Sequence, residues 1–332
     1  MTRKELTQVF DAFDKMHILI IGDVMVDSYL WGDVNRISPE APVPIIATTG
    51  RENRLGGAAN VALNIQSLGA TPIMCSVIAN DEAGDIFMQL LKGNQLPANG
   101  IISSGKRKTT VKTRIISQNQ HLLRIDEEEN HPLEASLEKK LQAHIEDLLN
   151  TYKIDAIIFE DYDKGVLTPA TIEATIKLAQ SKGIPTLVDP KKRNFNEYKG
   201  VTFFKPNLKE FKEGAKVDVS SHDKKALLQA ATTFIKEQNI RNFMVTMAEK
   251  GVMIVNQNKH HFIPAEVRDI ADVSGAGDTV ISVSALCVSA GLEEQLVAGI
   301  ANMAGGLVCE HPGVVPIDKQ ELLEECFEKL AE

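Results

Sequence analysis

The chain has few of the residues that build disulfide frameworks or metal centres. Among its 332 residues are four cysteines, none of them in a CxxC pair, which predicts reduced thiols and neither a disulfide framework nor a structural zinc site. The eight histidines also lack metal-ligand spacing, and His260 and His261 lie in a short alternating segment that favours a surface strand. We therefore expect no structural metal.

Long apolar runs and blocks of basic residues are missing as well. No segment reaches the roughly twenty apolar residues of a membrane span. Residues 1–16 carry mixed charge, unlike a secretory signal. The formal net charge of −9 argues against a nucleic-acid surface. These absences predict a cytoplasmic protein with small-molecule ligands and with neither nucleic acid nor a membrane as partner.

Two common nucleotide-binding signatures do not occur. The chain has no GxxxxGK[ST] loop, and no GxGxxG follows its first apolar run. A Walker-type ATPase and a dinucleotide-binding protein are therefore both disfavoured, and any phosphate site must be built from other residues.

Apolar runs alternate with helical patterns along most of the chain, and the 43% of hydrophobic residues is enough for a large core. The strand-like runs are 17–21, 71–78, 155–159, 186–188, 202–204 and 243–246. The helix-like patterns are 58–68, 83–91, 134–149, 169–181, 224–238 and, without a new strand, 292–332. This alternation predicts a doubly wound α/β fold, one mostly parallel sheet with helices on both faces, in a single domain over 1–332. Ligands of such sheets bind at the carboxyl ends of the strands.

Two regions depart from this rhythm. Residues 43–49, and 108–117 with 121–125, alternate polar and apolar side chains as half-exposed antiparallel strands do. Residues 117–120 are expected to form the hairpin turn between the last two. We expect a small β-sheet lid within about 24–50 and 105–127. Because one face of such a sheet needs cover, the lid also predicts a homodimer.

The most informative stretch is DVSGAGDT at 272–279. Gly275 and Gly277 permit positive φ and close approach of a ligand to the backbone, and the run 279–290 is typical of a buried helix, whose free N–H groups would attract an anion. Asp278 adds a carboxylate suited to deprotonating an attacking hydroxyl. The pattern predicts phosphoryl transfer to an alcohol. The alternative is a glycine-rich N-cap in which Asp278 bonds the helix N–H groups.

Several amino-terminal residues are candidates for binding a sugar. Asp23 and Asp27 follow the first strand, where carboxylates can accept paired hydroxyl groups. Gly56 and Gly57 open the next helix, and Asn60 in its first turns offers a donor and acceptors. The alternatives are a turn-capping role for either aspartate and simple tight packing for the glycine pair.

The second half of the chain holds candidates for the nucleotide and its metal. Asn207 and Glu210 lie three apart at the start of a helix and suit Mg²⁺, bound through water. They equally fit a capping box, and both interpretations can hold together. Thr246 and Gly251 bound a turn that would line the nucleotide pocket.

Read together, GGAAN at 56–60 and DVSGAGDT at 272–279 resemble, in order and separation, the two motifs of the ribokinase-like, or PfkB, sugar kinases. Within that family, one subgroup matches best: the heptose 7-phosphate kinases of lipopolysaccharide-core biosynthesis. The segments that carry this likeness are 22–29, RISPEAPVP at 36–44, 122–126, 161–167 and KPN at 205–207. The resemblance covers about 16–315.

The resemblance implies ATP, Mg²⁺, a β-sheet lid and a dimer clasped through it, and it leaves a monovalent cation possible. It implies that Asp278 is the base and that Gly275, Ala276 and Gly277 form the anion hole. Bifunctional relatives carry a nucleotidyltransferase domain after the kinase, whereas this sequence ends at Glu332. We therefore expect a separate protein to perform the nucleotidyl transfer.

The expected reaction moves the ATP γ-phosphoryl group to the anomeric hydroxyl of D-glycero-D-manno-heptose 7-phosphate. The 7-phosphate needs a cation, for which Lys191, Arg124 and Arg54 are candidates. One alternative is another PfkB carbohydrate or nucleoside kinase. A second is a non-catalytic sugar or nucleotide sensor, which the presence of Asp278 disfavours because binding alone requires no base.

Overall fold

The chain folds around two β-sheets. The computed structural model describes residues 1–118 and 120–331. The large sheet has the strand order β13-β12-β11-β10-β9-β8-β1-β4-β5. Its strands are β1 (His17–Gly22), β4 (Thr71–Ala79), β5 (Ile101–Ser104), β8 (Ala156–Glu160), β9 (Thr186–Asp189), β10 (Phe203–Phe204), β11 (Asn242–Thr246), β12 (Val252–Val255) and β13 (His260–Ile263). All neighbours pair in parallel except β11 with β12 and β12 with β13.

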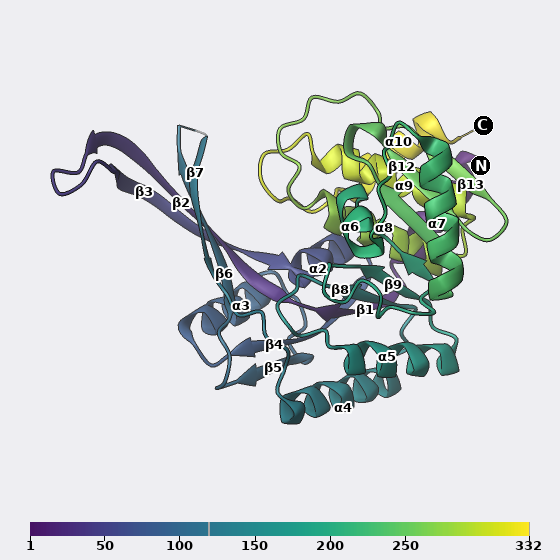
Figure 1. The fold of residues 1–332 in the computed structure, drawn as a ribbon, viewed down its shortest axis with the longest axis horizontal. Coiled ribbons are helices and arrows are strands. Elements are labelled where there is room, and N and C mark those ends of the chain that lie inside the picture. The colour runs from purple at the N-terminus through teal and green to yellow at the C-terminus, as the bar shows by residue number, and fades with distance from the viewer. Residues whose placement is uncertain (119, 332) are drawn as a thin grey trace.

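Helices cover both faces of the large sheet (Figure 1). One hydrophobic cluster joins the sheet to α1 (Arg3–Phe13), α2 (Ala58–Ser67), α3 (Glu82–Gly93), α8 (Ala276–Ser289), α9 (Glu294–Val308) and α10 (Lys319–Lys329). The other cluster joins the opposite face to α4 (Ala135–Thr151), α5 (Pro169–Lys182), α6 (Leu208–Ala215) and α7 (Lys224–Gln238). Because strands such as β1 are apolar along nearly their whole length, they bury both faces between these layers.

Local sequence signals set the helix ends. In α5, the Thr168 hydroxyl accepts a hydrogen bond from the Thr171 N–H, and Pro169 occupies the first turn, where its missing N–H costs nothing. Gly183 ends the helix at φ 67°, a left-handed conformation that favours glycine. The crossover between β8 and β9 is thus fixed by residues within it.

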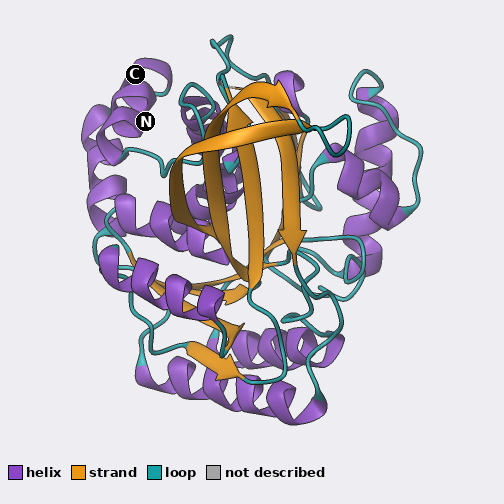
Figure 2. Cartoon of the chain, turned by 90° about the vertical axis from the view of Figure 1, so that its left-hand side faces the viewer, coloured by secondary structure: helices purple, strands orange, loops and turns teal. Residues whose placement is uncertain are grey.

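The second sheet, which we call the lid sheet, has the order β3-β2-β6-β7. Its strands are β2 (Val24–Ile37), β3 (Pro44–Gly57), β6 (Thr110–Ser117) and β7 (Gln120–Glu127). It projects from the body as a curved blade (Figure 1) and is seen nearly face-on in Figure 2. The pairs β2–β3 and β6–β7 are antiparallel, while β2 and β6 run parallel.

The expected fold is confirmed. The predicted doubly wound sheet, its helices and the separate lid are all present, with most boundaries within two residues. The lid is larger than the alternating segments predicted, because β2 and β3 each run for 14 residues. Asn119, in the expected hairpin turn, lies outside the described residues. The four cysteines are buried and free, and no helix in the described part of the chain has both the length and the apolar character needed to cross a membrane.

Candidate active site

The candidate site lies where several parallel strands of the large sheet end. Glu160 is the last residue of β8, Asp189 is the last of β9, and Lys205 follows β10. The start of α8 comes to the same place, since a Cβ built on Gly277 would lie 3.4 Å from Asp189 Oδ2 and 3.5 Å from Lys205 Nζ. The candidate site is therefore at the carboxyl edge of the sheet, where ligands of such sheets bind.

The first turn of α8 is open to a ligand. Its N-cap, Gly275, has φ 81°, and no side chain in the described residues caps the helix. The dipole of this buried helix is therefore directed at the strand ends, while among its first N–H groups that of Ala276 donates to the Val273 carbonyl oxygen at 3.4 Å. A bulkier residue than Gly277 would stand between the helix start and the charged side chains of Asp189 and Lys205. This geometry suits an anion such as a phosphoryl group.

A glycine, Gly275, is the N-cap of α8, but Asp278 does not bond the N–H groups of the helix as the N-cap alternative supposed. Its side chain is 5% exposed and accepts hydrogen bonds from Asn60 Nδ2 at 2.6 Å and from the Tyr162 hydroxyl at 2.7 Å. Burial raises the pKa of Asp278 to about 6, against the opposing effect of these two donors. The carboxylate is thus ionised at neutral pH and more basic than an ordinary aspartate, as a general base requires.

Asn60 links the two glycine motifs in space. It is buried in the first turn of α2, and its amide nitrogen is held by Asp278. Its Oδ1 atom is buried and has no hydrogen-bond partner among the described residues. A buried amide oxygen without a partner is unfavourable unless a ligand donates to it. A sugar hydroxyl lying against Asp278 would supply that donor.

Three buried carboxylates meet beside the helix start. One oxygen from each of Glu160, Asp189 and Asp278 lies within 4.8 Å of the others. Burial raises the pKa of Glu160 well above its usual range, and the charges of Asp189 and Asp278 raise it further. Lys205 Nζ, 2.7 Å from Asp189 Oδ2, offsets part of this negative charge.

This carboxylate cluster is the part of the structure that best fits a divalent cation. Glu160 Oε2 and Asp189 Oδ1 are buried and without a hydrogen-bond partner in the described chain. Hard cations such as Mg²⁺ take carboxylate oxygens as ligands, often alongside substrate phosphates. The orphaned oxygens beside an anion-binding helix start match that requirement.

Asn207 and Glu210 form the capping box of α6, so that interpretation is confirmed. The Glu210 N–H donates to Asn207 Oδ1, and Glu210 Oε2 accepts from the Asn207 N–H, both at 2.8 Å. The other oxygen of Glu210 pairs with Lys191. Both carboxylate oxygens are thus engaged, which favours the carboxylate cluster over this pair as direct metal ligands.

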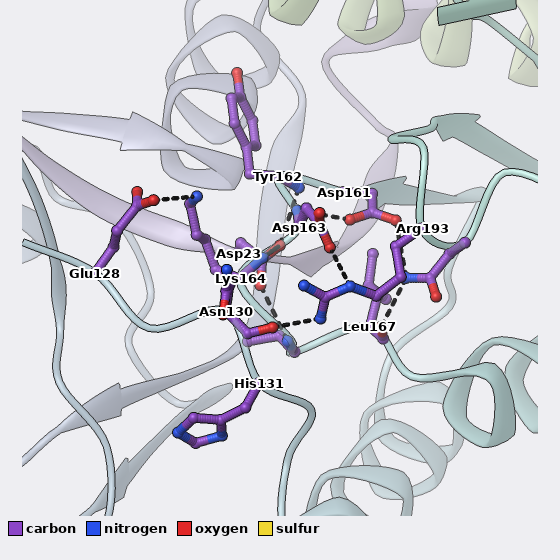
Figure 3. A network of polar contacts seen from close by, with 12 residues as sticks. Asp23, Glu128, Asn130, His131, Asp161, Tyr162, Asp163, Lys164, Leu167 and Arg193 are labelled. Atoms are coloured by element: carbon purple, nitrogen blue, oxygen red, sulfur yellow. Dashed lines mark hydrogen bonds and ion pairs between the residues drawn. The ribbon is translucent and has the colours of Figure 1, made fainter. Parts of the chain in front are cut away.

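The hydrogen bonds of Asp23 support the turn-capping interpretation of this residue. It is 1% exposed, and its carboxylate accepts hydrogen bonds from the backbone N–H groups of Tyr162, Lys164 and Val166. Figure 3 shows the loop after β8 gathered around it, with Lys164 bonded to Glu128 and Arg193 to Asp163 and Asn130. Asp23 therefore holds the loop that carries Tyr162 and leaves no oxygen free for a sugar.

Asp27 lies at the junction of the lid sheet and the large sheet. Its side chain is 8% exposed and pairs with Arg114 of β6. A Cβ on Gly56 would lie 2.3 Å from Asp27 Oδ2, and Gly57 has φ 60° with the Asp23 carbonyl oxygen 2.4 Å from where its Cβ would stand. Both glycines are thus required by close packing, and they let the chain pass beside the Asp27 carboxylate.

The remaining candidates lie at the end of β11 and in the turn after it, or on the lid. Thr246 ends β11 and forms a bridge to Asn207, and Gly251, at φ 83°, closes the turn after the 3-10 helix η1 (Ala248–Lys250). On the lid, Arg54 pairs with Glu52 at 2.6 Å and Arg124 with Asp126 at 2.8 Å. Both arginines therefore already have a carboxylate partner.

The expected strands 155–159, 186–188 and 202–204 place Glu160, Asp189 and Lys205 at strand ends, where charged residues converge, but sequence reasoning assigned these three no individual role. Their position after successive parallel strands was the available signal. Tyr162 entered only as part of the 161–167 segment, without a role in the site. Nothing in the sequence indicated that the Tyr162 hydroxyl would reach Asp278, because the two residues are 116 positions apart.

The family comparison matches nearly the whole chain. A profile described as pfkB family carbohydrate kinase matches residues 15–320. The "Bifunctional protein HldE" of Pelobacter propionicus is 35% identical over 324 residues, which are 97% of this chain and 66% of that protein. The protein of the same name from Koribacter versatilis is 40% identical over 307 residues, 92% of this chain and 62% of that one. The chain thus spans less than two thirds of these curated relatives.

Solved structures share the fold. Phosphofructokinase-2 of Escherichia coli, in complex with potassium, superposes with a TM-score of 0.77 at 16% identity, covering 93% of this chain and 98% of that one. Arabidopsis thaliana ribokinase, complexed with ribose and ATP, gives 0.71 at 15% identity, covering 93% and 99%.

Proposed function

The chain belongs to the pfkB family of carbohydrate kinases, ATP-dependent phosphotransferases, and from that membership we propose a specific reaction. The ATP γ-phosphoryl group passes to the anomeric hydroxyl of D-glycero-D-manno-heptose 7-phosphate, giving the 1,7-bisphosphate in ADP-heptose synthesis. One observation carries the chemistry: a buried, polarised carboxylate, Asp278, at the open start of α8. The substrate is supported by the likeness of segment 36–44 to heptose kinases and by the HldE relatives.

In this proposal Asp278 orients the acceptor hydroxyl and takes its proton, with Asn60 Oδ1 accepting a hydrogen bond from the same sugar. Phosphoryl transfer passes through a loose transition state that requires little prior deprotonation, so position matters more than basicity. The N–H groups of Gly275 and Gly277, and that of Ala276 on leaving its long bond to Val273, would donate to the equatorial oxygens of the transferring group, where a lost donor commonly costs about 2.7 to 4 kcal/mol.

The nucleotide lies on the carboxyl-terminal side of the candidate site, along Thr246, Gly251 and the α6 start. Mg²⁺ would be held by Glu160 and Asp189, with the capping pair Asn207 and Glu210 close by through water, and it would neutralise the phosphate charge. Lys191 lies on the same side: burial opposes its charge, but Asp189 and Glu210 raise its pKa above the usual value. A monovalent cation remains part of the proposal, to be tested by adding K⁺.

A substrate panel tests the function. Purified protein with ATP is offered heptose 7-phosphate, the unphosphorylated heptose, fructose 6-phosphate, ribose and a nucleoside, and products are identified by mass. We expect transfer to heptose 7-phosphate alone, abolished by omitting Mg²⁺. Preferred transfer to ribose, the nucleoside or fructose 6-phosphate would replace the heptose assignment with that acceptor. Tight sugar binding without transfer to any acceptor would support the sensor.

We also propose that the chain is a homodimer paired through its lid sheets. Most of the exposed large apolar side chains of the described residues lie on the lid, which is at one end of the molecule. They are Ile37, Val43, Leu122, Leu123 and Ile125. Every described residue of β7 is exposed. An apolar face of this kind on a small sheet is unfavourable in water unless another surface covers it.

Charges placed on that face should separate the subunits. In Leu123→Glu with Ile125→Glu, we expect monomers by light scattering at micromolar concentration and a raised sugar KM, because a lid without its partner closes less well over the sugar. Met88→Glu, at an exposed apolar position on α3, is the matched control and should leave both unchanged. A wild-type protein that is a fully active monomer would leave the dimer without support.

A further inference from the structure

One cation near the site has no carboxylate partner. Lys112 lies half-buried on lid strand β6, with Nζ 5.3 Å from the centre of the Tyr162 ring. No carboxylate oxygen in the described chain lies within ion-pair distance of it. Burial lowers the pKa of Lys112, and the positive charge of Lys164 lowers it further. A partly desolvated ammonium group without a counterion is unfavourable, so a ligand anion would stabilise it.

The charged groups around Lys112 are already matched with one another. Asp27 on β2 and Asp126 on β7 are its cross-strand neighbours, and Lys164 and Arg124 also lie close enough to act on its charge. Lys164 pairs with Glu128 at 2.8 Å (Figure 3), Arg124 pairs with Asp126, and Asp27 pairs with Arg114. These three pairs cancel, which leaves the charge of Lys112 as the local excess.

The same comparison separates Lys112 from the cations that the sequence suggested for the acceptor phosphate. Each of those three cations is already in an ion pair with a carboxylate: Arg54 with Glu52, Arg124 with Asp126, and Lys191 with Glu210. Lys191 also lies over the Tyr162 ring, with Nζ 5.5 Å from its centre, but its ammonium group is paired with Glu210 of the α6 cap. Lys112 can therefore bind an anion without first breaking an ion pair.

Its position fits the far end of the acceptor. Lys112 and Arg114 are two residues apart on β6 and therefore share a face of the lid sheet, and Arg114 contacts Asp27. Tyr162, over which Lys112 lies, donates its hydroxyl hydrogen to Asp278. The lid cation is thus one tyrosine ring away from the base.

We propose that Lys112 binds the phosphate that the sugar already carries, at the end of the acceptor remote from the hydroxyl facing Asp278. This inference rests on the proposed function, because it requires a phosphorylated acceptor. A phosphate monoester carries a charge of about −1.5 to −2 at pH 7, so it would supply the missing counterion. Because Lys112 is on the lid, phosphate binding also draws the lid toward the site, and the enzyme selects phosphorylated sugars by that contact.

Lys112→Met, Lys112→Arg and the exposed control Lys108→Met test the inference. For Lys112→Met we expect the KM for heptose 7-phosphate to rise about 10- to 100-fold with kcat little changed, as for loss of a charged hydrogen-bond partner. The KM for ATP should not change. Lys112→Arg should recover most of the loss, and Lys108→Met should behave as wild type.

A binding measurement without turnover completes the test. Heptose 7-phosphate should raise the melting temperature of the wild type and of Lys112→Arg. It should raise the melting temperature of Lys112→Met much less. The unphosphorylated heptose should raise the melting temperatures of all three proteins equally. A Lys112→Met protein with unchanged KM and unchanged stabilisation overturns the role of Lys112 alone. A wild type that prefers unphosphorylated sugars instead overturns the proposed function.

Discussion

Asp278→Asn should lower turnover at least about a hundredfold, the low end of general-base effects, while ATP and sugar still bind. Asparagine keeps the shape of the side chain and can still accept from Asn60 or Tyr162, whose contacts hold Asp278 in place. What it removes is the proton acceptor at the start of α8. Single-turnover kinetics with saturating substrates measure this effect directly.

Stability provides a second readout for the same variant. The pKa of Asp278 is raised to about 6 in the folded protein, above that of an unfolded aspartate, so the folded state binds the proton more tightly. Stability from this group is therefore lost as the pH rises through about 4 to 6, and at pH 7 the buried charge is destabilising. Asp278→Asn should then melt no lower than the wild type.

The exposed Asp269 allows a matched control, since Asp269→Asn makes the same chemical change in the segment before the motif. It should alter neither turnover nor melting. If Asp278→Asn turned over at a near-normal rate, the base would have to be another group, and Asp278 would be left as a structural carboxylate.

The second large effect is expected at Asp27. Asp27→Ala should raise the sugar KM about 10- to 100-fold, because charged hydrogen bonds to hydroxyl groups are lost, and it should leave ATP affinity unchanged. Asp27 lies on the first lid strand, paired with Arg114 and beside Gly56, and within the described residues it makes no hydrogen bond or ion pair with the start of α8. Calorimetric titration of each ligand separately measures both affinities.

Two further variants interpret that result. Asp33→Ala, exposed on the same strand, controls for a change in β2, and Asp27→Asn keeps the volume and limits the disturbance to Arg114. Weakened ATP binding with normal sugar binding would reverse the assignment of the two pockets. Asn60→Ala is expected to reduce turnover as well as sugar affinity, because its amide also holds Asp278.

The sequence by itself determined the fold class and the centre of the chemistry. Apolar runs alternating with amphipathic helices required a parallel sheet covered on both faces, because no other arrangement buries strands such as β1. The glycines and the acid of 272–279 predicted an anion site with a base, because the conformational freedom of Gly275 and the polarity of a helix start are local properties.

Only the tertiary structure decided what each charged side chain does. Asp23 and Asp27 look alike in sequence, but one is enclosed by three backbone N–H groups and the other faces the lid. The contact of Asn60 with Asp278 spans 218 positions. Such contacts depend on how strands and crossovers bring distant residues together, and neither local propensity nor periodicity encodes that arrangement. For the same reason, the sequence could not show that Lys112, which lies over the Tyr162 ring, lacks within the described chain the ion pair that Arg54, Arg114 and Arg124 of the lid each make.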